Sequence, residues 1–190
     1  MYKYKTTNFS NPLVLLVAFL MAFTAPVNAQ DTNPTFTQDS RAAVAKLPAV
    51  TDAMAVDVDE LDDQPVLVTF FASWCPPCRD EFAHLNKLHE KFKDTDLRIV
   101  AINVYEAWDD KDAIRMKKFI NSTQPAFPAV VGSEEIRNLF GGIDRIPTVY
   151  GFNRQGELTY RFIHKRGSKK TNATLDELEA AANSLLNSGE

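Results

Sequence analysis

The sequence predicts an α/β fold, with parallel strands in a central sheet and helices on both faces of that sheet. Residues 65–72 (PVLVTFFA) form a nearly unbroken apolar run of β-branched and aromatic side chains, which indicates a strand buried on both faces. Apolar residues at helical spacing follow at 79–93, with charged residues between them. Strand-like and helix-like stretches then alternate along the chain. This alternation is typical of a sheet with crossover helices.

Each further element is predicted from its local pattern of apolar residues. In chain order, the expected elements are a strand at 97–104 (LRIVAINV), a helix at 110–122, a short strand at 129–131, a helix at 134–140, two strands at 148–152 and 158–163, and a final helix from 174. The sequence NRQG between the last two strands suits a hairpin turn.

Two of these helices have recognisable ends. Ser133 is a suitable N-cap for the helix at 134–140, and Gly141 with Gly142 would stop it. Thr174 and Glu177 have the spacing of a capping box at the start of the final helix.

Residues 1–29 have the pattern of an export signal. Lys3 and Lys5 precede an apolar core at 13–25, and the small-residue site at 27–29 predicts cleavage after Ala29. The apolar run is shorter than the roughly 20 residues that span a bilayer, so an uncleaved membrane anchor is the less favoured alternative. A periplasmic location follows from this interpretation.

The remainder of the chain is expected to form one domain at 58–188, preceded by a loose N-terminal leader at 30–57. The whole chain has a net charge of −4 and contains no long basic run, so we expect no nucleic-acid partner. No apolar surface stripe is left over for a second copy, which predicts a monomer.

The chain contains two cysteines, Cys75 and Cys78, separated by two prolines. A disulfide between them would close so short a loop that it would restrict the unfolded chain very little. A catalytic role therefore explains the pair better than a structural one. At the N-terminus of a helix, unpaired N–H groups and the helix dipole favour a thiolate, so Cys75 is the expected nucleophile and Cys78 the resolving thiol.

The residues beside the cysteines extend this candidate site. Pro76 and Pro77 belong in the first helical turn, where their missing N–H groups cost least. Trp74 could shield the nucleophile and pack against an incoming chain, or it could be ordinary core.

A metal site is the main alternative for the cysteine pair, because zinc sites use the same spacing. A second ligand pair is missing, and the histidines are His84, His89 and His164. We therefore expect no bound metal and no cofactor besides the disulfide itself. A copper-binding or metallochaperone domain using both cysteines and His164 is the least implausible metal hypothesis.

The segment FFASWCPPCRDEF (70–82) resembles the active-site segment of the thioredoxin superfamily, and most closely its exported TlpA/ResA-like branch. LRIVAINV (97–104) resembles the next strand of that branch, 110–131 its inserted helix and strand, and IDRIPTVYGFNRQGEL its cis-proline segment. The resemblance covers about 58–186. It implies a thioredoxin-like fold with a central mixed β-sheet flanked by helices.

The resemblance also implies roles for three more residues. Pro147 would be a cis-proline facing the cysteines, and Ile146 could pair its backbone with a bound peptide; an ordinary trans proline is the alternative. Glu81 would influence the protonation of the cysteines, although glutamate is common in first turns for dipole reasons alone. Thioredoxin has a buried aspartate where this chain has Thr69, which would move the proton-accepting role onto Glu81.

The function implied by the resemblance is reduction of disulfides in cysteine-containing client proteins, with apocytochrome c as the best-known client. A membrane thiol reductase would return the electrons. A thiol peroxidase is the alternative of related fold, but the motif Pro-x-x-x-Thr-x-x-Cys does not precede Cys75.

Overall fold

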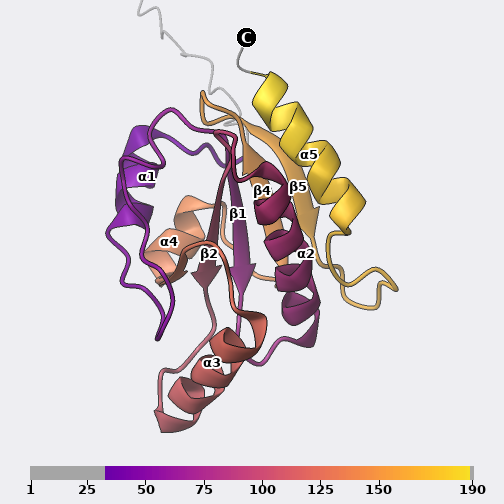
Figure 1. Cartoon of the computed structure of the whole chain (residues 1–190). Coiled ribbons are helices and arrows are strands. Elements are labelled where there is room, and N and C mark those ends of the chain that lie inside the picture. The colour runs from indigo at the N-terminus through magenta and orange to yellow at the C-terminus, as the bar shows by residue number, and fades with distance from the viewer. Residues whose placement is uncertain (1–32, 189–190) are drawn as a thin grey trace, which may run out of the picture. The chain divides into compact units, whose positions relative to one another are not determined.

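Five strands form a mixed sheet at the centre of the computed structural model, which describes residues 33–188 (Figure 1). The strands are β1 (Val66–Phe71), β2 (Arg98–Asn103), β3 (Ala129–Val131), β4 (Thr148–Phe152) and β5 (Leu158–Ile163). Their order is β3-β2-β1-β4-β5. β1, β2 and β3 are parallel, whereas β4 runs antiparallel to both β1 and β5. The mixed sheet and its hairpin at the end confirm the predicted thioredoxin-like arrangement.

Helices cover both faces of the sheet (Figure 1). They are α1 (Gln38–Ala45), α2 (Pro76–Phe92), α3 (Asp110–Thr123), α4 (Glu134–Leu139) and α5 (Leu175–Asn187). α2, α3 and α5 pack on one core, here called the α2-side core, while α1 and α4 pack on the other, the α1-side core. Members of the α2-side core include Leu67, Phe71, Phe82, Leu85, Phe119 and Leu178, and members of the α1-side core include Phe36, Val44, Val68, Phe70 and Ile136.

Side chains of β1 alternate between these two cores, as successive residues of a strand must. Leu67 and Phe71 face the α2-side core, whereas Val68 and Phe70 face the α1-side core. Thr69 lies between Val68 and Phe70, so its hydroxyl group points toward α2. A polar side chain is thus placed inside an apolar layer, against the helix that carries the cysteines.

The predicted helix boundaries agree with the structure to within a few residues. α2 begins at Pro76, three residues before the amphipathic stretch at 79–93, because the two prolines occupy its first two positions. The predicted caps are present: Ser133 Oγ accepts from Ile136 N–H at 3.2 Å, and Thr174 with Glu177 forms a complete capping box.

The segment expected to be a loose leader is instead packed onto the domain. The Phe36 ring is 1% exposed, and its N–H donates to Gly156 O at 2.8 Å, in the turn between β4 and β5. At the other edge of the sheet, Val50 N–H donates to Ala129 O at 2.9 Å and Pro48 O accepts from Val131 N–H at 2.8 Å. The buried apolar side chains of this segment are few and widely spaced, so they and these backbone contacts were not visible in the local pattern.

Arg41 of α1 fixes this segment in place. Its side chain is 2% exposed and donates hydrogen bonds to the backbone carbonyl groups of Leu61 and Gln64, the latter at 2.9 Å. The same guanidinium reaches the carbonyl oxygens of Asn153 and Arg154, each at 3.4 Å. A single side chain therefore joins three segments that are far apart in the sequence.

The export signal expected at residues 1–29, with cleavage after Ala29, lies outside the described residues. Within residues 33–188, no helix has the length and apolar character needed to cross a membrane.

Candidate active site

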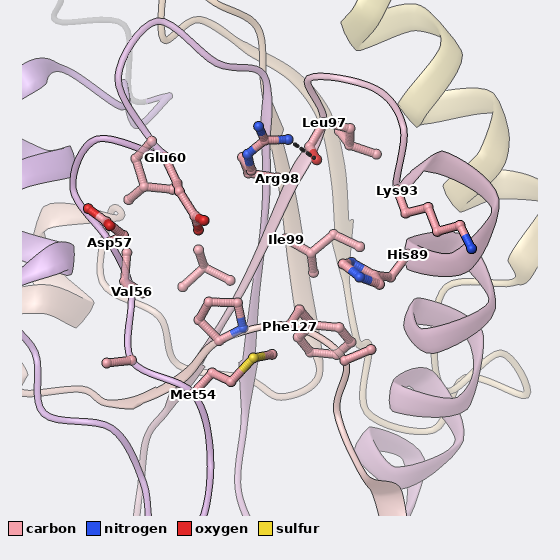
Figure 2. Close-up of a pocket in the computed structure, with 15 residues that line it drawn as sticks. Met54, Val56, Asp57, Glu60, His89, Lys93, Leu97, Arg98, Ile99 and Phe127 are labelled. Carbon is pink, nitrogen blue, oxygen red and sulfur yellow. Dashed lines mark hydrogen bonds between the residues drawn. The ribbon is translucent and has the colours of Figure 1, made fainter.

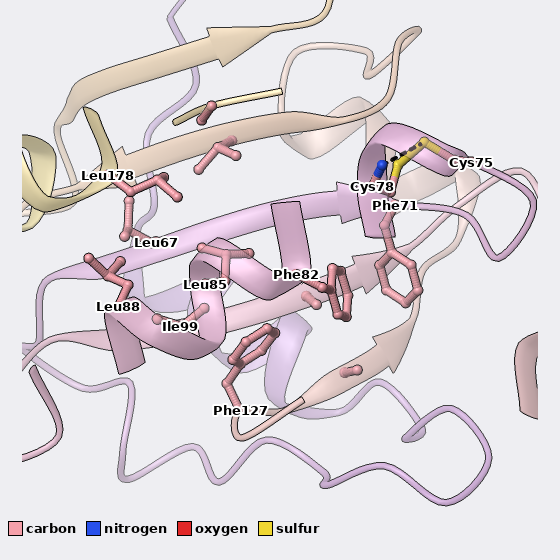
Figure 3. Close-up of a cluster of buried hydrophobic side chains, with 14 of the residues drawn as sticks. Leu67, Phe71, Cys75, Cys78, Phe82, Leu85, Leu88, Ile99, Phe127 and Leu178 are labelled. Atoms are coloured by element: carbon pink, nitrogen blue, oxygen red, sulfur yellow. Dashed lines mark hydrogen bonds between the residues drawn. A yellow bond between two sulfur atoms is a disulfide. The ribbon is translucent and has the colours of Figure 1, made fainter. Parts of the chain in front are cut away.

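The two cysteines lie at the N-terminus of α2, just after the end of β1 (Figure 3). Cys75 is the N-cap residue, and its Sγ accepts a hydrogen bond from the backbone N–H of Cys78 at 3.3 Å. The two sulfur atoms form a disulfide of 2.09 Å. Because the first N–H groups of a helix lack partners within the helix, this position favours a thiolate on Cys75 once the disulfide is reduced.

The two sulfurs differ in how far they can be reached. Cys75 is 5% exposed and Cys78 is fully buried, and both belong to the α2-side core together with Phe71 and Phe82. An attacking thiol must touch a sulfur of the partner, whereas a resolving thiol has to reach only its neighbour. The exposures thus agree with the predicted roles, which remain predictions.

Glu81 lies one turn after Cys78 and is fully buried. Thr69 Oγ1 donates to Glu81 Oε1 at 2.5 Å, while Oε2 makes no hydrogen bond of ordinary geometry. Burial disfavours the carboxylate and raises the pKa of Glu81 to about 7; Thr69, and more weakly the backbone of Ala173, act in the opposite direction. Residues three apart on a helix are neighbours, so Glu81 and Cys78 lie on the same side of α2.

The peptide bond between Ile146 and Pro147 is cis, as predicted. Pro147 immediately precedes Thr148, which pairs with Phe70 in the antiparallel register of β4 with β1. Pro147 is therefore level with the last residue of β1, at the same end of the sheet as the cysteines. Ile146 is partly buried and contacts both cores.

Trp74 is not a core residue, because its side chain is 47% exposed. Its indole Nε1–H donates to the backbone carbonyl of Tyr105 at 3.1 Å, which ties it to the loop after β2. The structure therefore excludes the core role for Trp74. The alternative that the sequence left open, an accessible ring that shields Cys75 or packs against an incoming chain, stays a prediction.

Sequence reasoning missed a charged network next to Trp74, in which Glu106 and Asp112 are buried and Arg115 is partly exposed. Glu106 Oε1 accepts from the backbone N–H of Ser73 at 2.6 Å, and Arg115 Nε donates to Ser73 Oγ at 3.0 Å. Arg115 also pairs with Glu106 and Asp112. These residues come from the loop after β2 and from α3. Their spacing in the sequence carries no local signal that could have grouped them with the cysteines.

A comparison with known protein families shows to which family this chain belongs. The model of the Redoxin family matches residues 28–179 of this chain. The chain belongs to the Redoxin family.

Relatives of this Redoxin protein include a thiol-disulfide oxidoreductase ResA from Bacillus thuringiensis subsp. konkukian, which is 24% identical over 174 residues and covers 88% of this chain and 94% of its own. Among solved structures, a thioredoxin-family thiol:disulfide interchange protein from Chlorobium tepidum TLS has a TM-score of 0.61 at 19% identity, covering 81% of this chain and 94% of its own. A secreted disulfide oxidoreductase of Mycobacterium tuberculosis, homologous to E. coli DsbE, has a TM-score of 0.60 at 18% identity, covering 77% and 99%. The two structures bear out the thioredoxin-like fold.

Two of the three histidines, His84 and His164, have a ring nitrogen close to a backbone carbonyl oxygen, and the backbone N–H of His164 donates to Pro147 O at 3.1 Å. His84 Nδ1 lies 2.9 Å from Ala173 O, and His164 Nδ1 lies 3.0 Å from Thr171 O. Across residues 33–188, no group of three or more His, Cys, Asp or Glu side chains is placed to hold a metal ion.

Figure 2 shows a pocket of about 620 Å³. It lies at the other end of the sheet from the disulfide. Its walls include the first residues of β2, which pair with the first residues of β1, whereas the cysteines follow the last residues of β1. Met54, Ile99 and Phe127 make it partly apolar, and Glu60 and Lys93 lie at its rim. The pocket has no contact with the residues assigned to the active site.

Proposed function

We propose that the chain is an exported thiol-disulfide oxidoreductase that reduces disulfides of client proteins through Cys75 and Cys78. One observation carries this proposal: the disulfide lies at the N-terminus of α2, with Cys75 the more exposed of the two sulfurs. Membership of the Redoxin family and the ResA name of several relatives support it.

The reaction has two exchanges that together move two electrons. In the reduced protein, the Cys75 thiolate attacks one sulfur of a client disulfide, which forms a mixed disulfide and releases the other client sulfur as a thiolate. The Cys78 thiolate then attacks Cys75 Sγ, which re-forms the internal disulfide and releases the second client thiolate. Both released sulfurs take up protons, so the client ends as a dithiol.

Glu81 has a place in the second exchange. Cys78 is fully buried and must lose its proton before it can attack Cys75. A neighbouring carboxylate can accept that proton, and a pKa of about 7 means that Glu81 exists in both protonation states near neutral pH. The ordinary pKa of a glutamate would leave it too weak a base for a thiol.

Trp74, Pro76, Pro77, Ile146 and Pro147 are proposed to contact the client. Ile146 directly precedes the cis-proline, level with the end of β1. Its backbone groups are suited to pair with an extended client segment while the target cysteine lies over Cys75.

Export to the periplasm, recharging by a membrane thiol reductase and a role in cytochrome c maturation complete the proposal. The pattern of residues 1–29 and the secreted relative from Mycobacterium tuberculosis support export. The cytochrome c role and the reductase rest on the resemblance to the TlpA/ResA-like branch. We expect a monomer.

The test combines trapping with a potential measurement. The Cys78→Ser variant should accumulate a mixed disulfide with a client peptide, whereas Cys75→Ser should not. The reduction potential, measured in glutathione or dithiothreitol buffers, should be about −230 mV or lower, toward the thioredoxin range. A value near about −120 mV would make the protein a disulfide donor instead. Turnover of hydrogen peroxide would favour the peroxidase alternative.

A further inference from the structure

Three aromatic side chains are exposed at the end of the sheet that carries the disulfide. Within residues 33–188, the exposed aromatic side chains are Trp74, Tyr105 and Trp108, with exposures of 47%, 39% and 39%. Trp74 directly precedes Cys75, and its indole donates to the backbone of Tyr105. Large exposed aromatic residues gathered in this way are typical of binding surfaces rather than of free protein surface.

The backbone beneath two of these rings adopts an unfavourable conformation. Tyr105 has φ = 62° and Trp108 has φ = 57°, in the left-handed region where bulky side chains are rarely found. The other residues of the described chain with positive φ are glycines, two aspartates and Gln124. Strained backbone of this kind persists where surrounding contacts impose it, and it clusters at functional sites.

The surrounding contacts come from the charged network of Glu106, Asp112 and Arg115. The Glu106 side chain, between the two aromatic residues, is fully buried and accepts from the N–H of Ser73. Asp112 Oδ2 accepts from the N–H of Trp108 at 3.1 Å, and Arg115 pairs with both acids. The network therefore holds the loop that carries Tyr105 and Trp108 against the residues that lead into Cys75.

A further contact joins the Tyr105 ring to the segment leading to Pro147. Its hydroxyl group donates to the carbonyl oxygen of Ile143, and the Arg137 guanidinium lies 4.8 Å from the ring centroid. The Tyr105 ring thus extends from the loop after β2 toward the segment that leads to the cis-proline.

We propose that Trp74, Tyr105 and Trp108 form an aromatic docking platform for a bulky apolar side chain close to the target cysteine of the client. This inference rests on the proposed function. Sulfur exchange requires a client sulfur to touch Cys75, which is only 5% exposed, so the client chain must cover the surface beside it. An extended chain advances about 3.3 Å per residue, so residues a few positions from the target cysteine come to lie beside Trp74, which directly precedes Cys75, and near the loop to which Trp74 is bonded.

The chemistry of the platform indicates which kind of client side chain binds to it. Aromatic rings gain most from apolar and aromatic partners, by offset or edge-to-face packing. The client is therefore an extended segment with an aromatic or large aliphatic residue a few positions from its reactive cysteine.

The experiment compares two disulfide-bonded peptides that differ only in carrying Phe or Ser beside the cysteine. The protein, reduced with dithiothreitol and freed from it, is mixed with each peptide, and the rate of mixed-disulfide formation is followed in a single turnover. Trp108→Asn should lower the preference for the Phe peptide about tenfold, the size of a lost aromatic contact. Its Tm should stay level or rise, because asparagine tolerates the left-handed conformation.

Two controls separate the possible outcomes. Met54→Ser removes another exposed apolar side chain, 48% exposed and on a wall of the distant pocket, and should leave the peptide preference unchanged. Hydroxyethyl disulfide, a probe too small to reach the platform, reports the intrinsic reactivity of the dithiol.

An unaltered preference in Trp108→Asn would overturn the platform while leaving the proposed function intact. An equal slowing with both peptides and with hydroxyethyl disulfide would also overturn it, because it would place the effect on the sulfur itself. A wild-type protein that reacts with neither peptide nor with hydroxyethyl disulfide would instead refute the proposed function.

Discussion

Thr69 and Glu81 share a hydrogen bond between the central strand and the helix that carries the cysteines, with 2.5 Å from Thr69 Oγ1 to Glu81 Oε1. It holds one oxygen of a fully buried carboxyl group, while the other oxygen has no partner of ordinary geometry. Burial removes water from this carboxyl group and raises the pKa of Glu81 to about 7, because the few donors that the site supplies offset only part of that effect. Through this hydrogen bond, Thr69 of β1 directly contacts Glu81, the proposed proton acceptor.

The first prediction concerns stability against pH. Between pH 4.5 and about 7 the folded protein keeps the proton of Glu81, whereas the unfolded chain has released it. The stability that the protonated Glu81 contributes to the folded state is therefore complete below pH 4.5 and is lost as the pH rises through 7. Glu81→Gln stays neutral throughout. Relative to wild type, its free energy of unfolding should therefore increase across this interval, by on the order of 3 kcal/mol. Urea unfolding of both oxidised proteins at several pH values measures the difference, and a constant difference would contradict the assignment.

The second prediction concerns the rate of disulfide exchange. If the Glu81 carboxylate accepts the Cys78 proton, the rate of the resolving step should rise with an inflection near pH 7, and Glu81→Gln should lose that inflection. Stopped-flow measurement of internal disulfide formation from a pre-formed mixed disulfide isolates this step. An unchanged pH profile in Glu81→Gln would remove Glu81 from the mechanism.

The third prediction tests the contribution of Thr69. Thr69→Val removes the hydroxyl donor at nearly constant volume, so the pKa of Glu81 should rise further and the inflection should move upward by about half to one pH unit. Thr148→Val is a matched control, because Thr148 is equally buried on the adjacent strand but donates to Arg145 O. Both variants should lose a similar amount of stability. A shift of the inflection in both, or in neither, would speak against a specific role for Thr69.

Local patterns in the sequence were enough to predict the strands, most helix ends and the position of the cysteines. The strand at 65–72 and the capping box at Thr174 depend on residues that are close together in the chain, and both are present in the structure. The contacts that the sequence could not supply join distant segments. The charged network around Glu106, the four long-range carbonyl contacts of Arg41 and the bond from Thr69 to Glu81 all depend on how the chain folds back on itself.

The fourth prediction compares two glycines with similar backbone angles. Gly156 has φ = 80° and Gly167 has φ = 77°, so alanine at either position is strained by about 1 kcal/mol. A Cβ at Gly156 would also lie 2.4 Å from Phe36 O, whereas nothing lies within 4 Å at Gly167. Gly156→Ala should therefore cost about 3 kcal/mol or more, because the backbone at Phe36 must move. Equal losses in denaturant unfolding would mean that the contact with Phe36 is dispensable.

The fifth prediction concerns the buried arginine of α1. Arg41→Met would leave several buried carbonyl groups without donors and should destabilise the protein by about 3 kcal/mol. Arg98→Met is the control. The Arg98 guanidinium donates to Thr95 O and Leu97 O, which are close to it in the sequence, so its loss should cost about 0.5 kcal/mol or less. Limited proteolysis should cut residues 33–64 faster in the Arg41 variant. Equal cutting rates in both variants would show that the arginine does not hold this segment.

The packing of the N-terminal segment sets the order in which the nascent chain can reach its final form. Residues 36–50 leave the ribosome early, yet their backbone partners include Ala129, Val131 and Gly156, which are made much later. Contacts between segments so distant in the sequence are slow to close. The part of the domain that is synthesised first is thus among the last to be secured. Until then its apolar side chains, Phe36 above all, are available to chaperones that bind unfolded chains.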